Sequence, residues 1–175
     1  MKRHVTDRGR QKMHTTFVGK QAVIIGAGIA GLSAAGALSD YFECVLVLER
    51  DSLSNQSAPR RGTSQGWHAH GLLVGGLAAL NELYPGVNDD FSRAGAVSLR
   101  VNEDLREELP DREPMPQRDF GLRGFTMTRP VTESTLRTCA LQRTNVSIRQ
   151  NTNVLAIEAD ARLGRNAGGR STAPA

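Results

Sequence analysis

The chain has 175 residues, of which 39% are hydrophobic and 5% aromatic, which is enough for the core of one domain. Its net charge of +4 is concentrated in the first twenty residues, so the basic character does not belong to a folded face. We therefore expect no nucleic-acid partner, and no stretch has the length of a membrane span or the apolar core of a signal peptide.

The two cysteines, Cys44 and Cys139, lie far apart and lack the spacing of a metal site. Cys44 begins an apolar segment, which favours a buried thiol over a disulfide. We expect reduced thiols, no bound metal and a cytoplasmic location, because disulfides are rare in the reducing cytosol.

Two apolar strands with a helix between them are predicted near the start of the chain. Residues 1–19 are basic and lack apolar periodicity, so we expect a disordered tail there. Ala22–Ile25 is β-branched and too short for a helix, which is typical of a strand buried on both faces. Apolar residues then recur at helical spacing as far as Leu38, and a second apolar strand, Val45–Leu48, follows.

Glycines recur in G-x-G-x-x-G spacing between the first strand and the helix, at Gly26, Gly28 and Gly31. The first permits a sharp turn, the second lets the backbone approach a pyrophosphate, and the third lets the helix pack closely on the sheet. Phosphates bind at a helix N-terminus because its N–H groups and macrodipole favour negative charge. Glu49, at the end of the second strand, suits a carboxylate that accepts hydrogen bonds from ribose. The sequence predicts a dinucleotide site, with an ordinary βαβ unit as the alternative.

The segment 51–66 is rich in Ser, Pro, Gly and Arg, which predicts a loop. It leaves the second strand at the edge of the sheet where ligands bind. Arg60 and Arg61 in this loop either meet cofactor phosphates or form a solvated basic surface.

Trp67–Tyr84 has leucines at helical spacing, which predicts a helix that Pro85 ends. His68 and His70 lie two residues apart, and on a helix this spacing does not place both on one face. A polar contact near a cofactor is therefore favoured over metal binding, with a capping or surface role as the alternative.

The rest of the chain predicts short strands and one helix. Acidic residues at 103–113 indicate a solvated surface rather than a catalytic cluster. The last two strands are so closely linked that they must be antiparallel or sharply bent. From 161 to 175 the pattern fails, so we expect a second disordered tail and a domain at 20–160. The predicted strands and helix are Ala96–Val101, Phe125–Thr128, a helix at Val131–Leu141, Asn145–Gln150 and Thr152–Glu158.

The predicted fold class is α/β. It is a partial Rossmann-type fold, with a parallel sheet flanked by helices, and it ends in the start of an antiparallel segment.

Several segments, in the same order, resemble the N-terminal part of flavoprotein monooxygenases and related FAD-dependent oxidoreductases. The FAD-binding start of that family is similar to GAGIAGLSAAGALSD followed by VLVLERD. Its P-R-x-G-x-x-Q-G-R-H-x-H-x-L-L segment is similar to PRRGTSQGWHAHGLL, and its R-P-x-L-E-x-x-L-R element to TRPVTESTLR. ELYPG, RAGAV and NVSI resemble the stretches between and after these. The resemblance covers about 21–160 and implies a glutathione-reductase-like FAD-binding fold.

The resemblance implies an enzyme that holds FAD, takes electrons from NAD(P)H and oxidises a small organic substrate with O₂. It identifies no catalytic residue, and it makes Glu133 a residue that orders its helix. Two alternatives stay open: a non-catalytic remnant that binds FAD or ADP weakly or not at all, and an NAD-binding dehydrogenase half. The residues expected to bind the cofactor are Gly26, Ala27, Gly28, Ile29, Ala30, Gly31, Glu49, Arg50, Arg61, Gln65, His68 and Arg129.

The sequence departs from the family pattern in three respects. Trp67 stands where the family has Arg, so bidentate phosphate donors are replaced by one N–H and a flat face. Thr132 replaces Leu, and its hydroxyl needs a partner if it is buried. Family members are more than twice as long and carry a later Gly-Asp motif, so we expect a truncated chain that is inactive alone. An unfinished sheet would leave an open edge for self-association.

Overall fold

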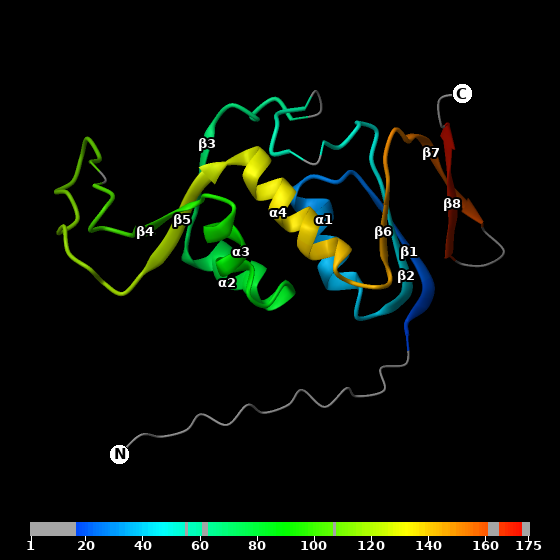
Figure 1. The fold of residues 1–175 in the computed structure, drawn as a ribbon, viewed down its shortest axis with the longest axis horizontal. Helices are drawn as coiled ribbons and strands as arrows, with labels where there is room; N and C mark the ends of the chain where they lie inside the picture. Colours follow the sequence, from blue (N-terminus) through cyan, green and yellow to red (C-terminus); the bar gives the residue numbers. More distant parts are fainter. Residues whose placement is uncertain (1–16, 55, 61–62, 107, 161–164, 173–175) are drawn as a thin grey trace, which may run out of the picture.

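The computed structural model describes residues 17–54, 56–60, 63–106, 108–160 and 165–172. The predicted Arg61 lies outside the described residues. Figure 1 shows the elements in chain order: β1 (Gly19–Ile25), α1 (Ile29–Leu38), β2 (Phe42–Leu48), β3 (Ala69–Leu72), α2 (Val74–Leu83), α3 (Val87–Arg93), β4 (Val97–Arg100), β5 (Arg123–Thr128), α4 (Arg129–Leu141), β6 (Val146–Arg149), β7 (Asn153–Asp160) and β8 (Arg165–Thr172).

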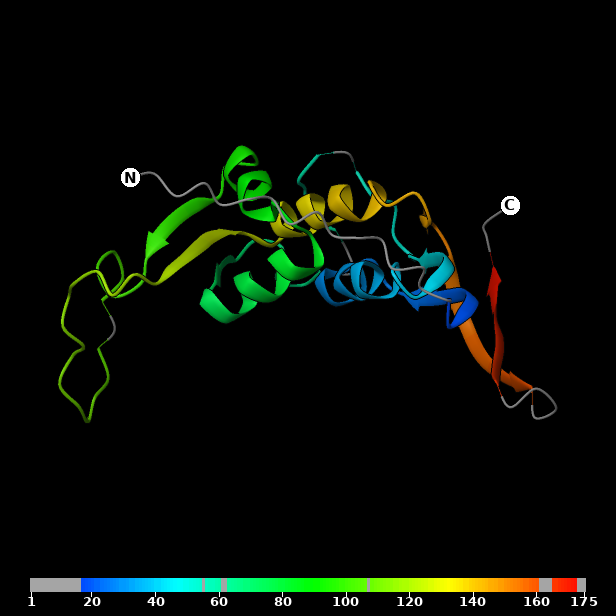
Figure 2. The same ribbon diagram turned by 90° about the horizontal axis from the view of Figure 1, so that it is seen from below.

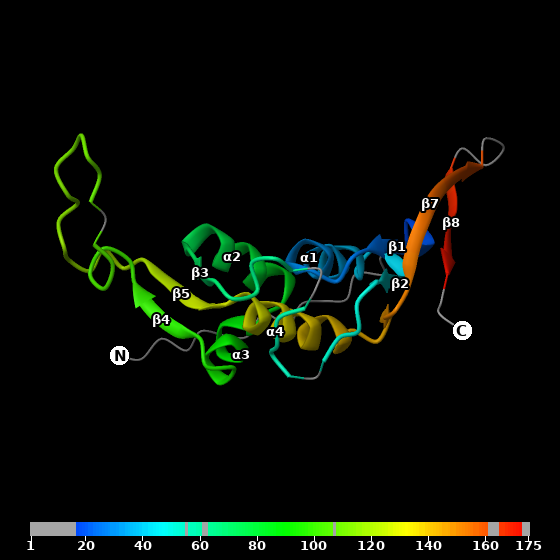
Figure 3. The same cartoon turned by 90° about the horizontal axis from the view of Figure 1, so that it is seen from above.

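The strands in the described part of the chain form three sheets. β1, β2 and β6 form a parallel sheet in that order, with Val23 opposite Leu46 and Val47 opposite Ile148. β3, β5 and β4 form an antiparallel sheet, and β7 pairs antiparallel with β8. Figures 1 and 3 show the helices between the first two sheets and the β7–β8 pair at one end of the molecule. The predicted α/β class is confirmed.

The core lies between one face of the parallel sheet and the helices α1 and α4, and it continues through α2 and α3 to β5. Val47 of β2, Leu32 of α1 and Leu136 of α4 are fully buried in it. On the opposite face Val23 and Ile25 of β1 are 47% and 55% exposed. The expectation that this strand is buried on both faces is therefore wrong, because the described helices cover only one of them.

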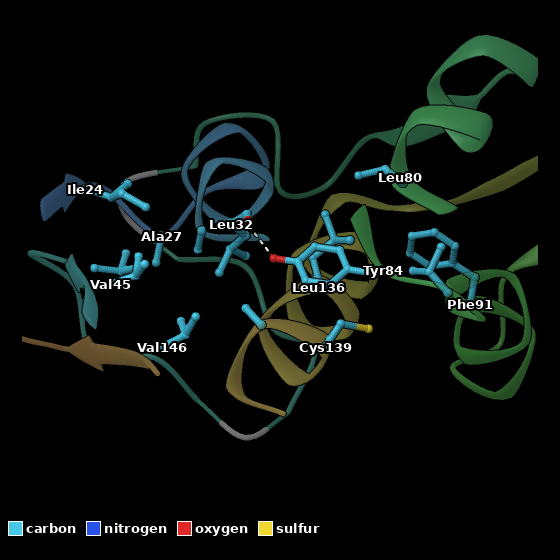
Figure 4. Packing of buried hydrophobic residues seen from close by; sticks show 14 of the residues in the cluster. Ile24, Ala27, Leu32, Val45, Leu80, Tyr84, Phe91, Leu136, Cys139 and Val146 are labelled. Atoms are coloured by element: carbon cyan, nitrogen blue, oxygen red, sulfur yellow. Dashed lines mark hydrogen bonds between the residues drawn. The ribbon is translucent and has the colours of Figure 1, made fainter. Parts of the chain in front are cut away.

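Tyr84, at the end of α2, joins that helix to α1. Its hydroxyl donates a hydrogen bond to the carbonyl of Leu32 (Figure 4). Its ring lies against Gly36. A Cβ at Gly36 would stand 2.7 Å from the ring carbon that bears the hydroxyl. Burial raises the pKa of the Tyr84 phenol to about 12. The close approach of α1 and α2 depends on the absence of a side chain at Gly36.

The segment 67–84 differs from its prediction in its first half. Only Val74–Leu83 is helical, whereas Ala69–Leu72 is strand β3 and pairs with β5. Helix propensity is weak where glycine is present, and pairing to a distant strand outweighs the leucine spacing. α3 was not predicted, because its seven residues are too few for a periodic pattern.

The C-terminal strands also add to the prediction. β6 and β7 lie in different sheets, and the bend between them contains Asn151 at a φ of 52°. This is the sharply bent alternative. β8 occupies part of the stretch expected to be disordered, since backbone pairing with β7 needs no apolar side-chain pattern.

Candidate nucleotide-binding site

A hollow of about 370 Å³ lies at the carboxyl ends of β1 and β2. This is the edge at which ligands bind in open α/β sheets. Loops and elements from distant parts of the sequence meet there. Its described lining residues are Ile25, Gly26, Gly28, Leu48, Glu49, Arg50, Arg60, Thr63, Arg129, Thr152, Asn153 and Val154.

The turn from β1 into α1 requires glycine at two positions for reasons of architecture. Gly26 has a φ of +94°, a conformation that residues with side chains rarely adopt. A Cβ at Gly31 would lie 1.9 Å from the carbonyl oxygen of Gly26, so a side chain there would force α1 away from the turn. The sequence-based interpretation of these two glycines agrees with this geometry.

At Gly28, neither the backbone conformation nor a steric clash requires glycine. Its backbone is extended, at a φ of −81°, and its missing Cβ would meet only side-chain atoms at 3.7–4.0 Å. These atoms are Oε1 of Glu133 and the Nη2 atoms of Arg129 and Arg60. In the described part of the chain no side chain caps α1, and its first turn holds no acidic residue. The N–H groups of that turn are therefore available to an anion beside Gly28.

Glu49 is a buried carboxylate that connects the glycine turn to the end of β2. Its Oε2 accepts a hydrogen bond from the N–H of Ala27 at 2.7 Å, and its Oε1 accepts one from the N–H of Asp51 at 2.9 Å. Arg60 Nη1 lies 3.2 Å from the same Oε1. Glu49 thus fixes the turn in place while its side chain still lines the hollow.

Arg60 is held by three carboxylates, and its side chain is 15% exposed. Nη1 donates to Asp51 at 3.1 Å, and both Nε and Nη2 donate to Oε2 of Glu133, at 3.2 and 3.1 Å. Nη2 also donates to the carbonyl of Ala27. Burial lowers the pKa of Arg60, but Glu133 and Glu49 outweigh that effect and raise it above its usual value. The interpretation as a solvated basic residue is wrong for Arg60.

Arg129 opens α4 and lies beside Arg60 across the carboxylate of Glu133. Its Nε donates to Oε1 of Glu133 at 2.9 Å, and its Nη1 donates to Oε1 of Gln65 at 3.1 Å.

One turn into the same helix, the buried hydroxyl of Thr132 donates to the carbonyl of Thr128 at 3.3 Å. The partner that the Thr132 hydroxyl requires is therefore supplied within the helix.

Solved structures of monooxygenases share this architecture. 2-Methyl-3-hydroxypyridine-5-carboxylic acid oxygenase matches 80% of the chain at 23% identity and a TM-score of 0.57. PqsL of Pseudomonas aeruginosa, described as a probable FAD-dependent monooxygenase, matches 87% at 17% identity and a TM-score of 0.60. p-Nitrophenol 4-monooxygenase PnpA of Pseudomonas putida matches 81% at 22% identity and a TM-score of 0.56.

The chain has the fold of the N-terminal part of FAD-dependent monooxygenases. It spans 34%, 38% and 34% of these three structures. Protein Rv3254 of Mycobacterium tuberculosis is 42% identical over 83 residues, which is 47% of this chain and 18% of that protein. No family model matches the sequence.

Five of the twelve residues predicted to bind the cofactor line the hollow at this edge of the sheet. These five are Gly26, Gly28, Glu49, Arg50 and Arg129. Gln65 is connected to the hollow through its hydrogen bond with Arg129. The other predicted residues of the turn, Ala27, Ile29, Ala30 and Gly31, are not among the described residues that line it. His68 is exposed, and its carbonyl oxygen lies 2.9 Å from Nδ1 of His70. His68 and the 84% exposed Trp67 are not among the described residues that line the hollow.

Sequence reasoning did not single out three participants of the site. The sequence leaves Arg60 with two alternative roles, and it predicts that Glu133 orders its helix and that Thr152 begins a strand. The sequence signal for Arg60 was present in the P-R-x-G pattern, whose arginine is Arg60 rather than Arg61. Nothing in the sequence places Thr152 beside Glu49. In the structure, the N–H of Thr152 donates a hydrogen bond to the carbonyl of Glu49 at 2.8 Å.

The described residues contain neither a metal-binding cluster nor a membrane-spanning helix. No group of three or more His, Cys, Asp or Glu side chains there is arranged to hold a metal ion. No helix in that part of the chain is long and apolar enough to cross a membrane.

Proposed function

We propose that this chain binds the ADP end of FAD in the hollow beside Gly28. It would serve as the nucleotide-binding portion of an FAD-dependent monooxygenase that oxidises a small organic molecule with NAD(P)H and O₂. The observation that carries the proposal is the space at Gly28. A Cβ there would be compatible with both the backbone and the packing, so the missing side chain leaves room for something other than protein.

The residues around that space have the chemistry of a dinucleotide site. The uncapped start of α1 and the guanidinium of Arg129 suit a pyrophosphate. The carboxylate of Glu49 suits the ribose hydroxyls, because each of its oxygens can accept more than one hydrogen bond. Bound flavin would supply the redox chemistry, while these residues bind and orient its nucleotide end.

The fold of the neighbours supports FAD over a nicotinamide as the resident nucleotide. The three structures are those of monooxygenases, and the one from P. aeruginosa is described as FAD-dependent. The substrates in their names, a pyridine carboxylic acid and a nitrophenol, are small aromatic molecules. We infer a substrate of the same general size for the enzyme that uses this site.

Titration of the purified chain with FAD, ADP and NADH tests the proposal. We expect FAD and ADP to bind to one site and to compete, with FAD retained on a desalting column as a yellow complex. Binding of NADH in preference to FAD would favour a dehydrogenase-type site instead. If none of the three nucleotides binds to the folded chain, the proposal is wrong.

A further inference from the structure

The two arginines beside Gly28 differ in how many of their donors are already used. All three nitrogens of the Arg60 guanidinium donate to protein acceptors, namely Glu133, Asp51 and the Ala27 carbonyl. Arg60 therefore connects the glycine turn, the end of β2 and α4, and it has little capacity left for a ligand.

Arg129 has spare capacity, and that capacity is directed at Gly28. Its Nε and Nη1 donate to Glu133 and Gln65. Its Nη2 has no hydrogen-bond partner in the described part of the chain, and it lies 3.9 Å from the position that a Gly28 Cβ would take. Nη2 of Arg60 lies nearly as close, at 4.0 Å, but it already donates to Glu133 and to the Ala27 carbonyl. The nearest atom, at 3.7 Å, is Oε1 of Glu133, the acceptor of Arg129. An anion over Gly28 would therefore find its free donor on Arg129.

Glu133 is the group that the two arginines share. It is buried, and each of its oxygens serves a different guanidinium: Oε1 accepts from Arg129, and Oε2 accepts from Arg60. Because Arg60 is itself fixed by Glu49 and Asp51, the position of the Glu133 carboxylate is fixed as well. That carboxylate holds Nε of Arg129, and together with the hydrogen bond from Nη1 to Gln65 it orients the guanidinium.

We propose that Glu133 is a positioning residue for phosphate recognition: it aims Arg129 at a pyrophosphate over Gly28. This rests on the proposed nucleotide function. The guanidinium is a planar fork, so its value to a phosphate depends on orientation as well as on charge. A long side chain without this anchor would lose much of that orientation on binding, at a cost in affinity.

The sign of one substitution separates this role from simple electrostatics. Glu133→Gln removes a negative charge close to the phosphate position, which by Coulomb's law alone would strengthen the binding of an anion. Loss of positioning predicts weaker binding instead. A purely structural role for Glu133 would weaken the binding of charged and uncharged ligands alike.

The experiment measures ADP and adenosine affinities in a double-mutant cycle of Glu133→Gln and Arg129→Gln. We expect Glu133→Gln to weaken ADP binding about tenfold and to leave adenosine binding within about twofold, with little further loss when it is added to Arg129→Gln. Glu82→Gln on α2 removes the same charge from an exposed position and serves as the matched control. Thermal unfolding of each variant checks that it is folded.

Arg129→Lys gives a second test that leaves the buried carboxylate intact. We expect it to lose nearly as much ADP affinity as Arg129→Gln, because an ammonium keeps the charge but not the oriented fork. Three outcomes would each overturn the positioning role and leave the nucleotide function standing. They are unchanged or tighter ADP binding by Glu133→Gln, equal losses of ADP and adenosine affinity in that variant, and full ADP binding by Arg129→Lys. A wild-type chain that binds neither ligand would overturn the nucleotide function and this inference together.

Discussion

The glycines between β1 and α1 differ in what a methyl group would meet at each. At Gly31 it would collide with the Gly26 carbonyl at 1.9 Å, and at Gly26 the backbone conformation itself excludes it. At Gly28 it would make ordinary van der Waals contacts with three side chains. Substitution at Gly28 therefore tests ligand space separately from folding.

Gly28→Ala should leave the melting temperature within a few degrees of wild type and weaken FAD and ADP binding at least about tenfold, or about 1.4 kcal/mol. The physical reason is that the added methyl occupies the approach of the pyrophosphate to the backbone. Calorimetric titration and thermal unfolding measure the two effects. Gly71→Ala, where an added Cβ has open space around it, is the control and should change neither. Retained nucleotide affinity in Gly28→Ala would show that the space serves another purpose.

Cys139 is a buried thiol whose ionisation is opposed by its surroundings. Its Sγ donates to Oδ2 of Asp90 at 3.4 Å. Burial, followed by the neighbouring carboxylate of Asp90, raises the pKa of the thiol from 9.0 to about 12. The folded state therefore keeps a proton that the unfolded chain releases in mildly alkaline solution.

The free energy of unfolding should consequently fall as the pH rises above about 9, and this loss continues towards the folded-state pKa of about 12. Measurement below about pH 10 limits the similar contribution of Tyr84, whose pKa is also raised. A raised pKa in the folded state gives stability that is complete below the unfolded pKa and is lost above it, by at most about 1.4 kcal/mol per pH unit. Cys139→Ala should flatten this slope in urea unfolding, whatever its effect on absolute stability, and Cys44→Ala should retain it. Parallel slopes for wild type and Cys139→Ala would contradict the assignment.

At the scale of elements, the local pattern of apolar residues predicted those helices and strands whose side chains pack into one core. β1 and β2 contain short β-branched apolar runs, α1 is an apolar segment that follows the glycine turn, and α4 begins with a proline in its first turn, so their identities follow from the sequence. β3 could not be predicted, since Ala69–Leu72 is set by pairing with Arg123–Thr128, more than fifty residues later. The exposure of the outer face of β1 could not be predicted either, because the composition of a strand does not tell how many of its faces are covered.

Gly36 and Gly75 offer opposite outcomes for the same change in two helices. Gly36→Ala places a Cβ 2.7 Å from the Tyr84 ring, and we expect a loss of about 1–3 kcal/mol from overpacking, which outweighs the gain in helix propensity. Gly75→Ala meets no atom within 4 Å, so the free energy of unfolding should stay equal or rise slightly. Urea unfolding of both variants measures this. A stabilised Gly36→Ala would mean that α1 and α2 are less closely packed than Tyr84 indicates.

At the scale of the whole molecule, the candidate site is assembled by tertiary contacts that no local pattern encodes. Arg60 and Glu133 are 73 residues apart, yet they share two hydrogen bonds. The sequence could predict the glycine turn and Glu49, because a strand, a helix and an acid at fixed spacing belong to one local unit. It could not predict which carboxylate would bind which arginine, and this pairing decides which arginine is left for a phosphate.

The arrangement of the sheets leaves one side of the molecule incompletely covered. β1 has β2 on one side and, among the described strands, no neighbour on the other. Its outer face also exposes Val23 and Ile25. Figure 2 shows the β7–β8 pair extending from the same end of the molecule, where Leu155 and Ile157 are exposed too. Apolar edge strands of this kind pair readily with other chains.

We therefore expect the isolated chain to self-associate in a concentration-dependent way through β1. Val23→Lys should suppress this association, because a charge on an edge strand opposes strand pairing without entering the core. Sedimentation velocity over a range of protein concentrations measures the effect. Val74→Lys provides the matched control, since Val74 is an exposed valine on helix α2, away from any sheet edge, and its substitution should leave the association unchanged. A wild-type chain that stays monomeric throughout, or equal effects of the two lysines, would contradict the role of the β1 edge.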